Sequence, residues 1–209
     1  MNKIIIIEII AISFLACVRS HADMVEPISR CRAYLEYPDI FPDNSDQDCT
    51  RWCATKKETN SDNVKCGICG PIYNDDITSP AVVKIKGVEH THWSFEKGSP
   101  MYRGNIVKIY KKGETIDIFV NVRAGHGGHF QFRICNADGL NTDPDMECFE
   151  KNILAFEDGS EKFWMREVKG SRYKFTDTNG VNHKLGGRAA RVILPADLTC
   201  KHCILQVIF

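Results

Sequence analysis

The sequence predicts an all-β fold, a β-sandwich that carries a long cysteine-rich loop region. Residues 116–122 alternate between aliphatic side chains and other types, and Phe130, Phe132 and Ile134 repeat this alternation. A period of two is typical of a half-buried strand. Residues 37–80 are instead crowded with Asp, Asn, Pro and Gly, hold four cysteines and show no helical period. We expect the order of that region to come largely from cross-links, beside one sandwich of packed sheets.

The strand signals begin at about residue 104. The runs 116–122 and 130–134 flank the glycine-rich segment Ala124–Gly128. They therefore predict two consecutive antiparallel strands whose connecting loop carries His126. Two further strands are predicted at 192–194 and 204–209, separated by a turn that contains two cysteines. There is no internal repeat and no Pro-rich linker, so residues 21–209 are predicted to form one domain.

Residues 1–20 have the pattern of a secretory signal peptide. A positively charged start precedes an apolar run over 4–18, and Ser20 occupies the −1 position of a cleavage site. Cleavage there would make His21 the new N-terminus, although a cut after Ala22 is also allowed. The apolar run is interrupted by Glu8 and is shorter than the ~20 apolar residues of a transmembrane helix. We expect a secreted, extracellular protein with no membrane contact after cleavage.

Nine cysteines remain once the signal peptide is removed, which indicates an oxidising compartment and disulfides. An odd number leaves at least one without an intrachain partner. The two Cys-x-x-Cys segments at 66–69 and 200–203 also have a spacing known from zinc sites, so zinc is the alternative. In a secreted chain we prefer disulfides, and we expect each of these four cysteines to pair with a distant one. The disulfide candidates are Cys31, Cys49, Cys53, Cys66, Cys69, Cys135, Cys148, Cys200 and Cys203.

The charge balance argues against several partners. The chain has 27 basic and 27 acidic residues, which indicates neither a nucleic acid nor an anionic membrane. A neutral glycan surface is compatible with this composition. There is no G-x-S-x-G motif and no phosphate-binding glycine loop between a strand and a helix.

Histidines are the candidates for chemistry. With a free amine, His21 would be a bidentate metal ligand through its α-amino nitrogen and one ring nitrogen. His126 lies among glycines that allow close approach to another segment, but it could also be an ordinary exposed loop residue. His129 could be a ligand or simply the first residue of a strand. His90 and His92 would share one face of an extended segment, either as surface residues or as metal ligands.

The order of several motifs along the chain resembles one family, the lytic polysaccharide monooxygenases, also known as type-4 chitin-binding domains. The resemblance is strongest to the animal and viral branch, auxiliary activity family fifteen, and it extends over nearly the whole of 21–209. It implies an immunoglobulin- or fibronectin-like sandwich. The motifs are His21 with Met24-Val-Glu-Pro-Ile-Ser-Arg30, Asp43-Asn44, Cys66-Gly-Ile-Cys-Gly70, Gly104-Asn-Ile-Val-Lys-Ile-Tyr110, Ala124-Gly-His126, Phe130-Gln-Phe-Arg-Ile-Cys135, and Leu194-Pro-Ala-Asp-Leu-Thr-Cys-Lys-His-Cys-Ile-Leu-Gln206.

The resemblance implies one copper ion per chain, held by the amine and ring of His21 and by the ring of His126. Three nitrogen donors in a plane suit Cu(II), which prefers tetragonal N ligands. Ala124 corresponds to the small residue that crowds one axial position in relatives, and Tyr34 is a candidate for the polysaccharide-binding surface. The implied reaction is oxidative cleavage of crystalline polysaccharide, chitin or cellulose, with O2 or H2O2 and an external electron donor. The resemblance also favours cleavage after Ser20.

The chain departs from the family pattern at its C-terminal end. Family members continue with further cysteines and an axial Tyr or Phe, whereas this sequence stops at Phe209, which is too early to fill that position. We therefore expect the C-terminal segment of the domain to be missing. Two other functions compete with an active monooxygenase: a non-catalytic protein that binds chitin or other glycans, and a disulfide-rich zinc or structural protein, which the resemblance disfavours.

Overall fold

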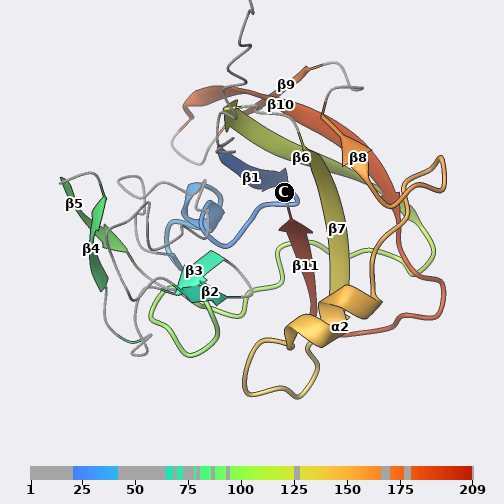
Figure 1. Ribbon diagram of the computed structural model, residues 1–209, viewed down its shortest axis with the longest axis horizontal. Helices are drawn as coiled ribbons and strands as arrows, with labels where there is room; N and C mark the ends of the chain where they lie inside the picture. The colour runs from blue at the N-terminus through green and yellow to red at the C-terminus, as the bar shows by residue number, and fades with distance from the viewer. Residues whose placement is uncertain are drawn as a thin grey trace, which may run out of the picture.

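A computed structural model provides the structure of the protein. The described residues form mostly strands, arranged as two main antiparallel sheets (Figure 1). This confirms the predicted all-β sandwich. The structure describes residues 21–41, 65–67, 70–72, 78, 81–85, 88–92, 95–124, 128–165, 170–176 and 180–208.

The first sheet contains the N-terminal strand. Its four strands have the order β1-β6-β10-β9, all antiparallel to their neighbours. The central strand β6 confirms the predicted strand over 116–122, because the alternating aliphatic side chains of Ile116, Ile118 and Val120 are buried. The bounds are β1 (His21–Glu26), β6 (Thr115–Ala124), β9 (Ser171–Thr176) and β10 (Asn182–Ile193).

The second sheet covers the buried face of the first. Its order is β11-β7-β8, with β7 at His129–Asn136, β8 at Phe163–Trp164 and β11 at Cys203–Ile208. Phe130 and Phe132 of β7 are fully buried in one cluster with the aliphatic side chains of β6. Burial of each ring stabilises the fold by about 1.5–3 kcal/mol. The predicted strand over 130–134 is thereby confirmed, and so is the strand over 204–209 as far as Ile208; Phe209 lies outside the described residues.

The prediction that strands β6 and β7 are antiparallel partners is wrong. Strand β6 is bonded on both edges, to β1 and to β10, and β7 lies in the other sheet between β11 and β8. The segment that follows Ala124 therefore connects two sheets rather than closing a hairpin. The alternation of side chains indicates only that one face of each strand is buried. It does not distinguish two strands that are neighbours in one sheet from two strands that face each other across the core in different sheets.

The predicted strand at 192–194 coincides with the end of the longer β10, which stops at Ile193. Sequence reasoning missed most of β10 because charged residues and two glycines interrupt its pattern. Gly187 is required by packing, since a Cβ there would collide with the carbonyl oxygen of Val120 and the ring of Phe119. The expected strand signal from residue 104 is also wrong, because residues 102–114 run as loop and turn before β6 begins.

Smaller elements decorate the sandwich. The cysteine-rich region contains the short hairpin β2–β3, a second hairpin, β4–β5, follows it, and much of the rest of 37–80 lies outside the described residues. Helix α2 begins after Asp145, whose carboxylate accepts a hydrogen bond from the Cys148 amide at 2.8 Å and so caps the helix. The bounds are η1 (Ala33–Leu35), β2 (Lys65–Gly67), β3 (Gly70–Ile72), β4 (Ala81–Ile85), β5 (Val88–His92) and α2 (Met146–Lys151).

Two disulfides confirm part of the cysteine prediction. Cys135 of β7 is bonded to Cys148 of α2, which fixes the helix against the end of the strand. Cys200 is bonded to Cys203, so the expectation of distant partners is wrong for this pair. The chain turns just before β11 and brings the two Cα atoms to 5.7 Å, within the range that a disulfide spans. Because both sulfur atoms are in the disulfide, Cys200 and Cys203 do not provide the thiolates that the zinc alternative requires.

Candidate metal centre

The first residue of β1 lies opposite the last residue of β6. In the antiparallel register, the Cα of His21 is the partner of the Cα of Ala124, with a register shift between His21 and Ala22. His126 follows Ala124 by two residues and lies outside the described residues, so the contact between the two histidines stays a prediction. The register places the start of β1 at the end of the sheet from which the predicted histidine loop departs (Figure 1).

A buried polar cluster anchors β1 two residues from its start. Asp23 is 4% exposed, and its carboxylate accepts hydrogen bonds from the Arg32 guanidinium and, at 2.8 Å, from the side-chain amide of Asn121. Asp23 and Asn121 are also register partners across β1 and β6. Because each charge is paired and hydrogen-bonded, the cluster satisfies the requirement for burying polar groups. The result is a fixed position for the strand that starts at His21.

The chain after β1 is held by a second arginine. Arg30 donates to both carboxylate oxygens of Asp143, at 2.7 and 2.8 Å, and to the carbonyl oxygen of Phe95 at 2.9 Å. Its guanidinium also lies 4.6 Å from the centre of the Tyr102 ring. Such a bidentate pair fixes direction as well as distance. Sequence reasoning missed both arginine clusters, because their partners lie far away along the chain.

Strand β8 closes the same end of the second sheet. The amide of Met165 donates to the carbonyl oxygen of Gly128 at 3.1 Å, directly beside the predicted histidine loop. His129 is the register partner of Trp164, and the two ring centres lie 4.9 Å apart. His129 is therefore the first residue of strand β7, with its ring against an indole, and the alternative that it is a metal ligand stays a prediction.

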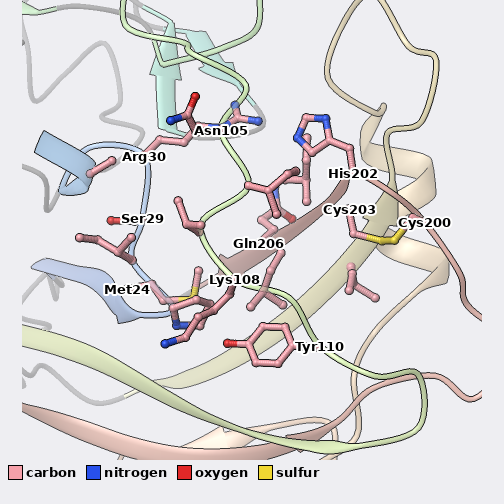
Figure 2. Close-up of a pocket in the computed structure, with 18 of the residues that line it drawn as sticks. Met24, Ser29, Arg30, Asn105, Lys108, Tyr110, Cys200, His202, Cys203 and Gln206 are labelled. Atoms are coloured by element: carbon pink, nitrogen blue, oxygen red, sulfur yellow. A yellow bond between two sulfur atoms is a disulfide. The ribbon is translucent and has the colours of Figure 1, made fainter. Parts of the chain in front are cut away.

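A large cavity lies between β1, the 101–112 loop and the outer edge of β11. It has a volume of about 870 Å³, and Met24, Lys108, Tyr110 and Gln206 all line it (Figure 2). Lys108 pairs with Glu26 at 3.1 Å, and the hydrogen bond to Glu26 raises the pKa of Lys108. Burial raises the pKa of Tyr110 to about 12, with a smaller contribution from nearby carboxylates. The lining comes from segments that are distant in sequence, so no local signal indicates this cavity.

The remaining candidate residues fall in different places. Tyr34 lies in η1, just after β1, and is half-buried. His90 and His92 lie two residues apart in β5, as the extended-segment prediction requires, and their metal role stays a prediction. Of the other disulfide candidates, Cys31 lies in the loop after β1 and Cys66 in β2. Cys49, Cys53 and Cys69 lie outside the described residues.

Comparison with known proteins agrees with this architecture. Residues 21–207 match the family described as lytic polysaccharide mono-oxygenase, cellulose-degrading. Among solved structures, the chain is similar to the lytic polysaccharide monooxygenase AA15 from Thermobia domestica in the Cu(I) state. That likeness has 24% identity and a TM-score of 0.61, and it covers 90% of this chain and 81% of the other. No curated protein matches the sequence.

The chain belongs to the lytic polysaccharide monooxygenases, a family of copper-dependent enzymes that oxidise polysaccharides. The family match begins at His21, the residue at which β1 also begins. Within the part of the chain that the structure describes, no helix has the length and apolar character needed to cross a membrane.

Proposed function

We propose that this protein is a secreted copper monooxygenase that starts at His21 and cleaves crystalline chitin oxidatively. The observation that carries the proposal is the pairing of His21 with Ala124 at the ends of β1 and β6. His126 follows Ala124 by only two residues in the sequence, so we expect its ring to meet His21 at this end of the sheet. Both residues belong to the matched range 21–207.

The donor set fits copper. Cleavage after Ser20 would free the His21 amine, which adds a third nitrogen to the two imidazoles. Neutral nitrogen donors suit Cu(II), which also has the highest affinity among the divalent first-row metals. Bound copper supplies the one-electron redox chemistry that O2 or H2O2 activation requires. Ala124 would be the small residue beside one axial position of the bound metal, as the family resemblance implies.

The protein's own residues keep this geometry in place. The Asp23–Arg32–Asn121 cluster holds β1 against β6, so the N-terminal residue starts from a buried and rigid strand. The Met165–Gly128 hydrogen bond fixes the other end of the predicted histidine loop at 3.1 Å. A site supported on both sides by strands can open onto a flat crystal face without losing its geometry.

The overall reaction balances with an external reductant. One oxygen atom of O2 enters a C–H bond beside the glycosidic linkage, and the other leaves as water after taking up two electrons and two protons. With H2O2 the same hydroxylation needs no further electrons. The hydroxylated carbon then expels the glycosidic oxygen as an alcohol, which breaks the chain. Insoluble polysaccharide and an electron donor are therefore the two partners.

Copper spectroscopy tests the metal site. Electron paramagnetic resonance of the secreted protein should show one type-2 Cu(II) signal with nitrogen couplings, and N-terminal sequencing should begin at His21. His126→Ala, or one extra residue before His21, should abolish that signal, whereas the control His202→Ala should retain it. An unchanged spectrum in either test variant contradicts the proposed site.

Product analysis tests the activity. Incubation with chitin, copper and ascorbate should release oxidised oligosaccharides, and cellulose serves as the parallel substrate. Oxidised products from cellulose but not from chitin would show that the substrate is cellulose and would contradict the proposal for chitin. Intact copper binding without oxidised products from either polymer would instead show a glycan-binding protein that lacks turnover.

A further inference from the structure

We propose that Trp164 is a sugar-stacking platform that extends the polysaccharide-binding face beside the metal centre. This inference rests on the proposed function for the identity of the ligand, a neutral pyranose polymer. Trp164 is 46% exposed, and it is the only Phe or Trp among the large apolar side chains that the described residues expose. An exposed indole has a large apolar surface, and covering that surface with a ligand is favourable in free energy.

The strand geometry explains why this indole faces outward. Consecutive side chains of a strand point to opposite faces. Phe163, the preceding residue, points into the core, with its ring centre 6.5 Å from that of Phe130 and 5.4 Å from that of Phe156. Trp164 therefore points away from the core, and one side of its ring is supported by His129 at 4.9 Å. The supported ring is held in place and still presents nearly half of its surface.

Trp164 also lies on the same end of the sandwich as the metal centre. Its register partner His129 comes three residues after His126, which limits their Cα separation to about 11 Å. The next residue, Met165, is hydrogen-bonded to Gly128. Helix α2 lies at the opposite end of β7, where Cys148 is bonded to Cys135 (Figure 1). One oligosaccharide segment can therefore contact both the indole and the metal centre.

The surroundings of the indole fit a neutral sugar. Trp164 and Phe163 border a groove of about 750 Å³ between β8 and the β6–β10 part of the first sheet. Four acidic and three basic side chains line it, so the groove has no strong charge of one sign. Arg191 forms exposed ion pairs there with Glu157 and Asp117, at 2.7 and 3.3 Å. Such groups can exchange their partners for sugar hydroxyls, while the indole covers a C–H face of the ring.

Adsorption of the copper-free protein tests this platform separately from catalysis. Isotherms on insoluble chitin should show about tenfold weaker binding for Trp164→Ala. Trp164→Phe and Trp164→Tyr should restore most of the affinity, because they keep a flat ring. The matched control is Ile109→Ala, which removes an exposed apolar side chain from the 101–112 loop. Thermal unfolding of each variant establishes that it is folded.

Tryptophan fluorescence supplies a second readout. Chitohexaose should quench the emission of the wild-type protein, and Trp164→Phe should remove that quenching while it retains adsorption. Adsorption of Trp164→Ala equal to wild type, quenching that persists in Trp164→Phe, or no adsorption of the wild type would each overturn the inference. All Trp164 variants should keep the Cu(II) spectrum. Loss of the copper site with Trp164-dependent adsorption intact would refute the proposed reaction and leave the platform standing.

Discussion

Replacing Asp23 with alanine should strongly destabilise the protein, because the buried carboxylate of Asp23 pairs with the buried guanidinium of Arg32. The Asp23 side chain is 2% exposed and that of Arg32 is 9% exposed. Asp23→Ala leaves the positive charge of Arg32 and the amide of Asn121 without this acceptor. A buried charge that loses its partner is far more costly than a buried pair that is absent altogether.

The expected loss follows from this burial. Breaking a buried ion pair by removing one partner costs about 3–5 kcal/mol. For a domain of this size, each 1 kcal/mol lowers Tm by about 2–4 °C, so Tm should fall by roughly 6–20 °C. The double variant Asp23→Leu with Arg32→Leu should lose less than the sum of the single changes, because it leaves no unpaired charge.

Urea denaturation of the mature protein measures the effect. The matched control is Glu147→Ala, which removes an acid from the Glu147–Lys151 pair, whose side chains are 71% and 70% exposed. That change should cost less than about 0.5 kcal/mol. If Asp23→Ala costs no more than Glu147→Ala, the buried pair does not anchor β1. A Cu(II) titration of the same variants should show weaker binding only where β1 has lost its anchor.

Further outcomes are expected at three places: Tyr110, the Cys135–Cys148 disulfide and strand β11. Burial raises the pKa of Tyr110 to about 12, so its neutral form stabilises the folded protein fully below pH 10, and this contribution is lost as the pH rises through 12. Tyr110→Phe should remove this loss of stability at high pH. An unchanged dependence of stability on pH in that variant would contradict the prediction. The same variant should be as stable as wild type or more so at pH 7, since among the described residues the buried hydroxyl has no hydrogen-bond partner. Replacing Cys135 and Cys148 together by alanine should lower the free energy of unfolding in urea by about 3 kcal/mol. Metal analysis of the wild type should find no stoichiometric zinc, and one zinc per chain would refute the disulfide interpretation. Among the described strands, β11 is at the edge of its sheet, so it should promote self-association, measured by sedimentation velocity. Val207→Lys should suppress this association, and a monomeric wild type would show that the edge is covered.

The local sequence was sufficient for the strands that form the centre of each sheet. Ile116, Ile118 and Val120 are buried in the core, as their alternation predicts, and so are Phe130 and Phe132. The long strand β10 was only partly predictable, because Gly187 and charged residues interrupt its apolar pattern. Its glycine is explained by close contact with Val120 and Phe119, and neither residue is near it in the sequence.

For the candidate site, the sequence by itself predicted the chemistry: which histidines can act as donors, the expected copper and the family, and of these the family is confirmed. Only the tertiary structure decided what lies beside them. It places His21 against Ala124, pairs Trp164 with His129, and buries Asp23 with Arg32. It also sends β6 and β7 to different sheets, which their equal alternation could not reveal. The physical reason is that periodicity records whether a side chain is buried, whereas its partner is set by long-range packing of the whole chain.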